Sequence, residues 1–482
     1  MSDFELSPSA RGVHGDGIDR GRLRRSAPLV GLTARLAHEA LVARLRGRRA
    51  VADRIEFHVR SAERYAELLG HSKGALMKAG QMASFALMSS AVPPEIQSIY
   101  QTALMGLCDD APPMAPELAC EVLEHELGQR VETVFAQFDW EPLAAASIGQ
   151  VHAAQLHDGR AVAVKVQYPG AADAIRADMK NTELLATFLT LTVGGMSPRR
   201  LSFDLRGAAR EMGVHILEEL DYRLEAASQA EFADYYRGHP FIHVPGVVDE
   251  LCTGRVLTQE LVRGLSWSDA LTARQELRDQ WAEAIYRFAY GTYERIYQFN
   301  ADPHPGNYVF HEDGSVSFLD FGCVKRFSRE QVQMMDVIVR ESLRNDVLGT
   351  WRACVEAGFF KSSDPVTPEE VFAYWREDGA MLWAQQRFVV TPEYAAKRIE
   401  RRCSPNGPSA NAFRHITMSP EYAIMSRMEV GVMSVVAQLR AGTHWGSIAA
   451  EHFENAPPFT AMGKREHAFF EGTPSRKSCL VV

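Results

Sequence analysis

Three polar residues in the second half of the chain have the types and spacing that phosphoryl transfer requires. The stretch FNADPHPGNYVF sets Asp302 and Asn307 in a D-x-x-x-x-N pattern. This pattern supplies an acceptor for the proton of an incoming hydroxyl or water and a neutral oxygen ligand for Mg²⁺. Asp320 begins the triplet Asp-Phe-Gly at the end of a predicted strand, where a carboxylate holds the metal that bridges nucleotide phosphates. We therefore predict Asp302 as a catalytic residue and Asn307 and Asp320 as metal ligands.

A lysine and an acidic helix extend this set toward the N-terminus. Lys165 lies near the end of the strand-like run AVAVKV, and the predicted helix EELDYRLEAA carries Glu219, Asp221 and Glu225, any of which can offer the lysine an ion-pair partner. Each element alone is a weak signal. Their order along the chain (hairpin, lysine strand, acidic helix, D-x-x-x-x-N loop, Asp-Phe-Gly) matches that of a kinase nucleotide site. The order predicts ATP and Mg²⁺ as cofactors.

The hairpin before the lysine departs from the pattern of protein kinases. Where G-x-G-x-x-G-x-V is usual, the chain has alanine at the first two glycine positions and keeps only the third glycine. Alanine disfavours positive φ and adds a Cβ, so we expect a stiffer loop that still binds nucleotide. The residues predicted to contact the nucleotide here are Ala144, Ala145, Ala146, Ser147, Gly149, Val151 and Lys165.

The region around the catalytic loop argues against ordinary protein phosphorylation. Phe299-Asn300-Ala301 precedes Asp302, so the His-Arg pair of protein kinases is absent. After Gly322 only CVKRF remains before Ser328 to Gln331, which predict a capping box that opens a helix. A segment this short leaves no platform for a peptide substrate. The ADPHPGN stretch resembles the catalytic loop of small-molecule kinases such as aminoglycoside and choline kinases.

Four motifs together resemble the UbiB/AarF family of atypical kinases, which includes members that support coenzyme Q. They are KAGQMAS, AAASIGQVH, EELDYRLEAA and ADPHPGNY followed by LDFG. The resemblance implies an α+β fold, bilobal and protein-kinase-like, with a helical N-terminal extension and a mainly helical C-lobe. The corresponding ranges are 1–26 (disordered), 27–140 (helical extension), 141–262 (N-lobe with a helical insert) and 263–482 (C-lobe).

The resemblance also implies roles for individual residues. The KxGQ motif places Lys78 and Gln81 on a helix that folds over the active site. With Asp302, the predicted catalytic residues are then Lys78, Gln81, Lys165 and Glu225. An ExD motif falls on Glu219 and Asp221, and Glu225 matches the glutamate that pairs with Lys165. The adenine-binding hinge falls at 259–262, so Glu260 and Val262 are expected to contact the nucleotide.

Secondary-structure patterns fit this organisation. Residues 50–140 look all-helical, strands are predicted in SIGQVHAAQL, AVAVKVQ and RVLTQELV, and a turn is predicted at His157-Asp158-Gly159-Arg160. After Gly264 the pattern predicts helices apart from one short β-hairpin, NYVFHEDGSVSFLDFG.

Composition limits the partners and the compartment. The net charge of −9 gives no basic field that would attract nucleic acid. Seven scattered cysteines without a CxxC pair indicate reduced thiols. We expect no membrane-spanning helix, no secretory signal and no mitochondrial presequence, and hence a cytoplasmic protein. The arginine-rich amphipathic segment 28–49 is either a peripheral contact with the anionic inner membrane or a helix packed on the domain.

These observations predict a Mg²⁺-dependent ATPase or small-molecule kinase that supports isoprenoid quinone or lipid metabolism at a membrane surface. Its expected partners are a lipid or quinone-related small molecule and other proteins of a biosynthetic complex. Two alternatives stay open. One is a non-catalytic nucleotide-binding scaffold, and the other is a conventional protein kinase.

Overall fold

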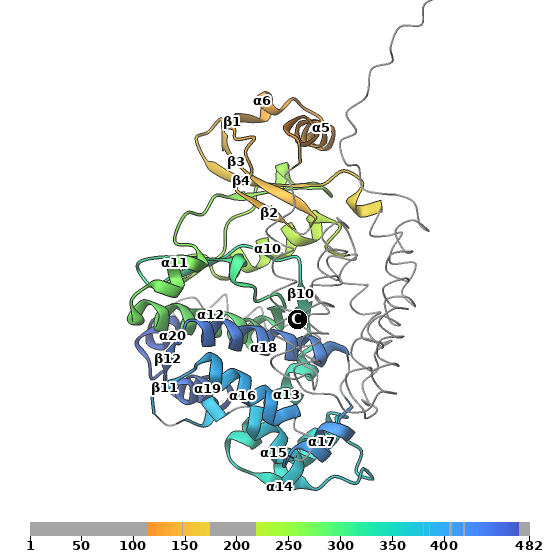
Figure 1. Ribbon diagram of the computed structural model, residues 1–482, viewed down its shortest axis with the longest axis vertical. Helices are drawn as coiled ribbons and strands as arrows, with labels where there is room; N and C mark the ends of the chain where they lie inside the picture. The colour runs from red at the N-terminus through yellow and green to blue at the C-terminus, as the bar shows by residue number, and fades with distance from the viewer. Residues whose placement is uncertain are drawn as a thin grey trace, which may run out of the picture.

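The chain folds into two lobes, each with its own hydrophobic core (Figure 1). The computed structural model describes residues 114–146, 148–173, 218–378, 380–384, 386–403, 407–417 and 420–471. The smaller lobe is built around an antiparallel sheet, and the larger lobe is mainly helical. The predicted basic segment 28–49 and the KxGQ motif lie outside the described residues.

The N-lobe sheet is held together by two long central strands. β3 (Gly149–Leu156) pairs with β4 (Ala161–Gln167), and β4 pairs with β6 (Val256–Glu260). Along β4 the side chains of Val162, Val164 and Val166 are buried, as expected for period-2 alternation on a half-buried strand. The predicted turn between β3 and β4 is confirmed, and Gly159 adopts a φ of +89° there, which a side chain would disfavour.

Two further strands and two helices complete this lobe. β1 (Phe135–Phe138) and β2 (Ala144–Ala146) both pair with β3, whereas α6 (Val131–Val134) leads into β1. The prediction that 50–140 is all helical was therefore wrong at β1, and the sheet begins before residue 141. Because α5 (Pro116–Leu127) contributes Ala119 and Leu123 to the same core, it belongs to this lobe as well.

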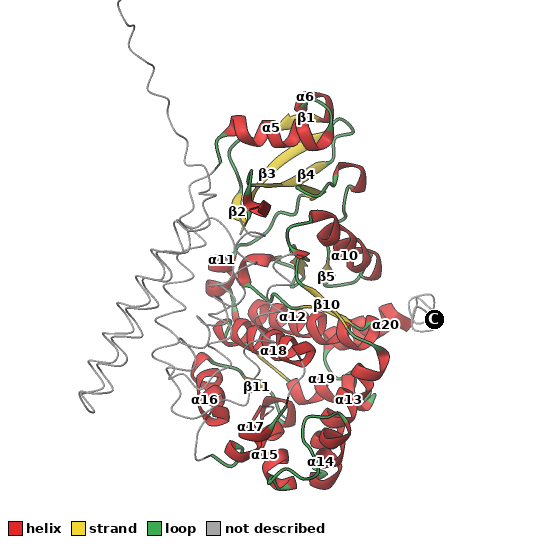
Figure 2. Ribbon diagram, turned by 90° about the vertical axis from the view of Figure 1, so that its right-hand side faces the viewer, coloured by secondary structure: helices red, strands yellow, loops and turns green. Residues whose placement is uncertain are grey.

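Helix α10 (Tyr222–Tyr235) lies between the sheet and the C-lobe in both side views (Figures 1 and 2). Asp221 caps it by accepting a hydrogen bond from the backbone N–H of Arg223. Glu219 lies in the turn before the helix, not within it as predicted. On the C-lobe side, Phe232 packs against Phe288 and Phe321.

The long helix α12 (Gln275–Ile296) forms the centre of the C-lobe, and most of its residues are buried. α11 (Trp267–Thr272) precedes it, and short β-strands follow it. The helices beyond those strands are α13 (Arg329–Leu343), α14 (Val347–Glu356), α15 (Pro368–Asp378), α16 (Pro392–Cys403), α17 (Ala410–His415), α18 (Pro420–Gln438), α19 (Trp445–Glu454) and α20 (Ala461–Glu471). The predicted capping box at Ser328 and Gln331 is confirmed at the start of α13.

The C-lobe contains more β-structure than the single hairpin that we predicted. The hairpin itself is present as β8 (Tyr308–Phe310) and β9 (Val316–Phe318), and β5 (Ile242–His243) pairs with β9 in parallel. In addition, β7 (Gln298–Asn300) pairs with β10 (Val324–Arg326), and β11 (Phe388–Val389) with β12 (Gly442–Thr443). Strands of two or three residues carry too few side chains to show a period, so tertiary pairing alone reveals them.

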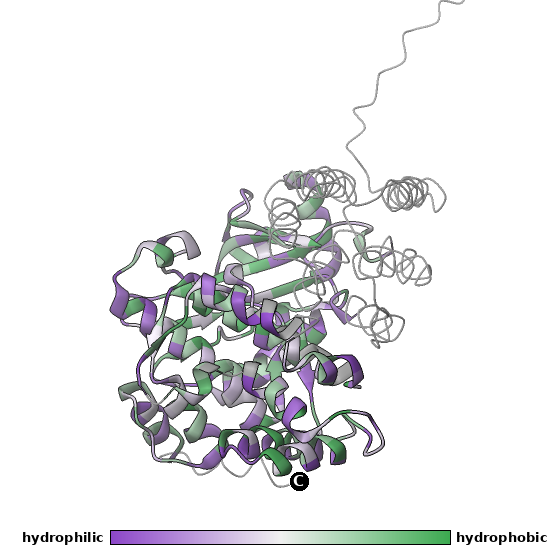
Figure 3. Cartoon of the chain, turned by 60° about the horizontal axis from the view of Figure 1, so that its bottom comes forward, coloured by the Kyte–Doolittle hydropathy of each residue, from purple (hydrophilic) through white to green (hydrophobic). Residues whose placement is uncertain are grey.

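Three 3₁₀ turns connect these elements in the described residues: η1 (Asp249–Leu251), η2 (Pro305–Asn307) and η3 (Ala380–Trp383). Hydrophobic residues run along the strands of the N-lobe sheet and are interrupted by hydrophilic ones (Figure 3).

Candidate nucleotide site

Lys165 lies on β4 and pairs with Glu225 of α10. Its Nζ donates to both carboxylate oxygens at 2.9 Å each. The two side chains are 15% and 4% exposed, so the pair is largely shielded from water. Of the three acidic residues offered by the sequence, the structure therefore selects Glu225 as the partner, in agreement with the family resemblance.

The same lysine reaches across to the C-lobe. Lys165 Nζ lies 3.4 Å from Asp320 Oδ2, while Asp320 Oδ1 accepts the backbone N–H of Gly322 at 3.0 Å. Glu219 lies beside this turn, because a Cβ at Gly322 would stand 3.6 Å from its Cγ. One lysine thus meets carboxylates from both lobes.

The catalytic loop brings Asp302 and Asn307 together. Asn307 Nδ2 donates to the backbone carbonyl and to Oδ2 of Asp302, each at 3.2 Å. The N–H of Leu319 donates to the carbonyl of Asn307 at 3.0 Å, so the β8–β9 pairing places Asn307 next to the Asp320 turn. Since the amide nitrogen of Asn307 is engaged, its side-chain oxygen is the atom that can ligate a cation.

The alanine-rich hairpin forms as predicted. In this hairpin, β2 pairs with β3 through Ala144 with Val151, Ala145 with Gln150 and Ala146 with Gly149. Two residues connect the strands, and one of them, Ser147, lies outside the described residues. The retained Gly149 has a steric reason, since a Cβ there would lie 2.3 Å from the carbonyl oxygen of Val166. The hairpin therefore packs directly onto β4, the strand that carries Lys165.

At the predicted hinge, two backbone N–H groups donate hydrogen bonds to carbonyls of neighbouring segments. The N–H of Glu260 donates to the carbonyl of Gly246 at 2.8 Å, and that of Leu261 donates to the carbonyl of Ala161 at 3.1 Å. The side chain of Glu260 is half exposed, 3.5 Å from His243. Contacts of Glu260 and Val262 with a nucleotide remain predictions.

At this site, the two carboxylates of Glu225 and Asp320 face the single ammonium group of Lys165. Burial opposes the charge of Lys165, but Asp320 and Glu225 outweigh it and raise the lysine pKa well above its ordinary value. Burial raises the pKa of Glu225 to about 7, against the attraction of Lys165 and with the added repulsion of Asp320. Carboxylates that crowd one lysine favour an added cation.

These residues fit Mg²⁺ held together with a nucleotide. In the described part of the chain, no group of three His, Cys, Asp or Glu side chains could hold a metal ion by itself. Mg²⁺ in kinase-type sites needs only one or two protein oxygens, because phosphate oxygens and waters complete its shell. Asn307 and Asp320 offer such a partial set.

Sequence reasoning missed one residue of this site. Asn300 donates through Nδ2 to the backbone carbonyl of Asp320 at 2.5 Å and accepts the N–H of Asp302 through Oδ1 at 2.9 Å. In the sequence, Asn300 stands out only as part of the Phe299-Asn300-Ala301 stretch that replaces a His-Arg pair. The available signal was a side chain with both a donor and an acceptor placed two residues before Asp302. Of the predicted catalytic residues, Lys78 and Gln81 lie outside the described residues.

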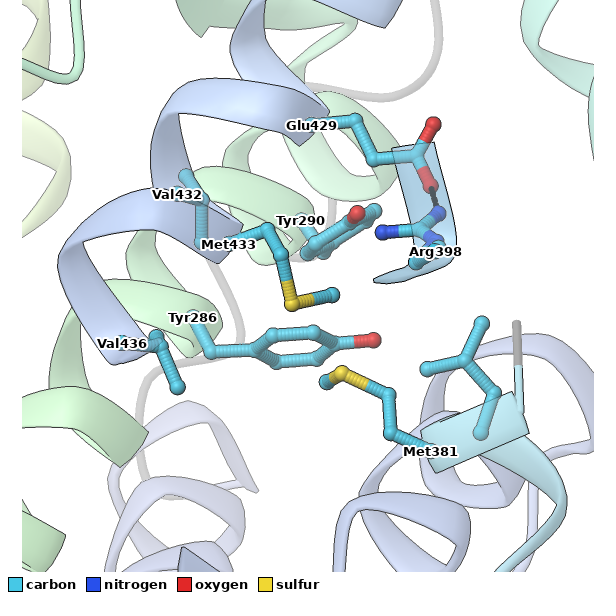
Figure 4. Close-up of a pocket in the computed structure, with 9 residues that line it drawn as sticks. Tyr286, Tyr290, Met381, Arg398, Glu429, Val432, Met433 and Val436 are labelled. Atoms are coloured by element: carbon cyan, nitrogen blue, oxygen red, sulfur yellow. Dashed lines mark hydrogen bonds and ion pairs between the residues drawn. The ribbon is translucent and has the colours of Figure 1, made fainter. Parts of the chain in front are cut away.

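A small pocket lies elsewhere, inside the C-lobe between α12, η3, α16 and α18. Figure 4 shows the ring of Tyr286 between Met381 and Met433, with the Arg398–Glu429 ion pair at one edge. None of the residues that line this pocket belongs to the Lys165–Asp320 site.

As for a membrane anchor, no helix in the described ranges combines the length and the apolarity needed to cross a bilayer.

Comparisons with known proteins agree with the geometry. Residues 106–350 match the family profile of the ABC1 atypical kinase-like domain. The chain is 32% identical over 283 residues to Protein ACTIVITY OF BC1 COMPLEX KINASE 1, chloroplastic, of Arabidopsis thaliana, covering 57% of this chain and 40% of the relative. It is 33% identical over 287 residues to Atypical kinase COQ8B, mitochondrial, of Rattus norvegicus, covering 59% and 52%. The match thus spans about half of these curated relatives or less.

A solved structure supports the fold. The complex structure of Rv3197 with erythromycin, from Mycobacterium tuberculosis, superposes with a TM-score of 0.59 at 28% identity and covers 77% of this chain and 90% of that one. The predicted kinase-like α+β fold and the family resemblance are both confirmed.

Proposed function

Because the chain belongs to the ABC1 atypical kinase-like family, we propose that it is a Mg²⁺-dependent ATPase or small-molecule kinase that supports isoprenoid quinone or lipid metabolism at a membrane surface. The observation that carries the proposal is the convergence of Lys165, Glu225 and Asp320 between the lobes. A lysine fixed by a buried carboxylate and facing an aspartate of the other lobe is the arrangement that positions nucleotide phosphates in kinases.

Each residue of the site then has a role. Lys165 binds phosphate oxygens while Glu225 fixes its direction. Asp302 accepts the proton of the attacking water or hydroxyl, and Asn307 and Asp320 hold Mg²⁺. The metal, when bound, neutralises the charge that develops on the phosphates. We retain Lys78 and Gln81 as further site residues and Ala144, Ala146 and Gly149 as the cover over the phosphates.

The segment after Asp320 supports a small acceptor or water. Only Cys323 lies between Gly322 and β10, and α13 begins at Arg329. β10 is itself paired with β7, so these residues are committed to the lobe and offer no groove for a peptide. This argues against a conventional protein kinase.

The names of relatives support the metabolic assignment. The rat and nematode relatives are called atypical kinases COQ8B and coq-8 and are described as mitochondrial. For this chain we propose a lipid or quinone-related small molecule as ligand, biosynthetic-complex proteins as partners, and peripheral membrane contact through 28–49.

ADP release by the purified full chain tests the proposal. We expect Mg²⁺-dependent turnover that rises with anionic liposomes and is lost in Asp320→Asn, but persists in Asp234→Asn, which removes a largely exposed carboxylate of α10. Nucleotide binding without turnover under every condition would instead identify a scaffold. ADP that appears only after a metabolite extract is added would identify a kinase for a free small molecule.

A further inference from the structure

We propose that Asn300 is a positioning residue that fixes the catalytic aspartate and the metal-binding aspartate relative to each other. The inference rests on the proposed function, since it concerns the same site. The side chain of Asn300 contacts the backbone of Asp302 and of Asp320, which lie in different loops.

The orientation of the Asn300 carboxamide is set by its partners. The backbone N–H of Asp302 can only donate, so it requires Oδ1, and the carbonyl of Asp320 can only accept, so it requires Nδ2. A flipped amide would lose both hydrogen bonds. The side chain is therefore held in one orientation by two groups that are close in space but far apart in sequence.

The position of Asn300 explains why a side chain is needed there. Asn300 is the last residue of β7 and pairs with Val324 of β10, and the N–H of Ala301 donates to the carbonyl of Cys323 at 2.8 Å. Asp302 and Asp320 lie just past the end of the β7–β10 pairing, and the two segments meet again where the N–H of Leu319 donates to the carbonyl of Asn307 at 3.0 Å. The carboxamide continues the connection past the end of the strand pair.

The other contacts of the two aspartates complete the restraint. Asn307 holds the carbonyl of Asp302 while Asn300 holds its N–H. On the second loop, the N–H of Gly322 and the ammonium of Lys165 hold the carboxylate of Asp320 while Asn300 holds its carbonyl. In-line phosphoryl transfer is sensitive to misplacement, and a shift of about 1 Å can cost about 100-fold in rate.

An ordinary turn would make only half of these contacts. Acceptance of the N–H of residue i+2 by an Asn side chain is a common Asx turn, and it would stabilise the loop without any link to Asp320. Asn300→Asp separates the two roles. Aspartate keeps the acceptor for Asp302 but loses the donor and turns a negative charge toward the carbonyl of Asp320.

The test compares Asn300→Asp, Asn300→His and Asn411→Asp in the full chain. Histidine retains one donor and one acceptor. Asn411 is the control, because its Nδ2 also donates to a backbone carbonyl, that of Pro365 at 2.7 Å, and to the carboxylate of Glu370 at 2.9 Å, but it lies on α17. The measurements are kcat, KM for ATP, the Mg²⁺ concentration for half-maximal rate, and Tm.

We expect Asn300→Asp to lower kcat about 10- to 100-fold, as loss of outer-shell partners does at metal sites, and to raise the Mg²⁺ requirement. Asn411→Asp should leave kcat and the Mg²⁺ requirement unchanged although it lowers Tm by placing a carboxylate against Glu370, and Asn300→His should recover most of the loss in kcat. A kcat of Asn300→Asp within twofold of the parent, or a loss that follows Tm alone with no rescue by histidine, would overturn the inference.

A second readout does not depend on turnover. If the parent chain releases no ADP under any condition, including after a metabolite extract is added, the proposed function fails, and the Mg²⁺ dependence of the Tm increase caused by ADP decides about Asn300. We expect Asn300→Asp to need about tenfold more Mg²⁺ for the same increase. An unchanged requirement contradicts the inference, and a parent that gains no stability from Mg²⁺ and ADP contradicts both proposals.

Discussion

Lys165 Nζ lies 2.9 Å from each carboxylate oxygen of Glu225, although sixty residues separate the two in sequence. The contact joins β4 of the sheet to α10, the helix that packs on the C-lobe through Phe232 and Phe321. The ring of Tyr222 lies 4.9 Å from the same ammonium group. One buried ion pair therefore links the sheet to the helix that faces the Asp-Phe-Gly turn.

A double-mutant cycle measures this link. Lys165→Met leaves Glu225 buried without its cation, and Glu225→Gln leaves Lys165 with Asp320 at 3.4 Å. The losses of unfolding free energy in these two variants should therefore sum to more than the loss in the double variant. We expect a coupling free energy of about 2 kcal/mol in urea unfolding. The control pair is Arg160–Asp158, which is half exposed on the β3–β4 turn and should couple much more weakly because solvent screens it. Equal coupling free energies in the two pairs would show that the burial of Lys165 does not strengthen its interaction with Glu225.

The sequence could predict which polar side chains the structure brings together, because Lys165, Asp302, Asn307 and Asp320 stand out by type and spacing. Regular strands such as β4 were predictable for a related reason, since their buried valines alternate over several residues. The resemblance to the family came from four motifs in their order along the chain: KAGQMAS, AAASIGQVH, EELDYRLEAA and ADPHPGNY followed by LDFG.

The parts that the sequence could not reveal depend on tertiary pairing. β7 and β10 have three residues each and acquire strand geometry only because they pair with one another. The role of Asn300 depends on that pairing, since Asp320 reaches its carboxamide only after the two strands meet. The choice of Glu225 over Glu219 likewise follows from where α10 begins, at Tyr222 after the Asp221 cap.

Asp336 on α13 should make stability depend on pH. Burial raises its pKa to about 7, and repulsion from Glu294 on α12 adds to this effect, against attraction by Arg340 and by His452 of α19. Its Oδ1 is buried without a hydrogen-bond partner. Because the folded pKa exceeds the unfolded one, the native state holds the proton more tightly, and stability falls as pH rises from about 4 to 7.

Asp336→Asn removes this titration. We expect the variant and the parent to unfold at similar temperatures at pH 4, and the variant to unfold about 1 °C higher at pH 8, which corresponds to about 1 kcal/mol in a chain of this length after allowance for solvent screening. Thermal unfolding followed by circular dichroism at several pH values provides the comparison. Asp234→Asn serves as the control, and a constant difference between Asp336→Asn and the parent at all pH values would refute the assignment.

Gly149→Ala should disrupt the alanine-rich hairpin. The new Cβ would lie 2.3 Å from the carbonyl oxygen of Val166 and 3.0 Å from the hydroxyl of Tyr222, and backbone cannot yield as a flexible side chain can. We expect a loss of about 1–3 kcal/mol, as for other overpacked sites, together with weaker nucleotide binding, because β4 carries Lys165. Ala145→Gly on the facing, exposed strand β2 is the control. It should cost no more than about 1 kcal/mol, and a similar loss in both variants would mean that the contact with Val166 is unimportant.

The last prediction concerns the ion cluster that attaches α20 to α12. Arg287, 1% exposed, bonds to Glu283 and Glu451 at 2.8 Å and to Glu466 at 2.9 Å. Burial alone would raise the pKa of Glu466, but Arg295 and Arg287 outweigh it and lower this pKa to about 2. Since the folded pKa lies below the unfolded one, the contribution of Glu466 is present above about pH 4.5 and is lost as pH falls toward 2.

Arg287→Met leaves these carboxylates buried without their shared cation, so we expect a loss of about 3–5 kcal/mol at pH 7. The deficit should shrink toward pH 5, because carboxylates deprived of the cation take up protons more readily than those of the parent. Adding Glu466→Gln to Arg287→Met should restore part of the stability for the same reason. Urea unfolding at pH 5, 6 and 7 measures the effect, with Arg160→Met as an exposed control expected within about 0.5 kcal/mol of the parent. A deficit that stays constant with pH, or that Glu466→Gln deepens, would mean that lost packing and not uncompensated charge accounts for the role of Arg287.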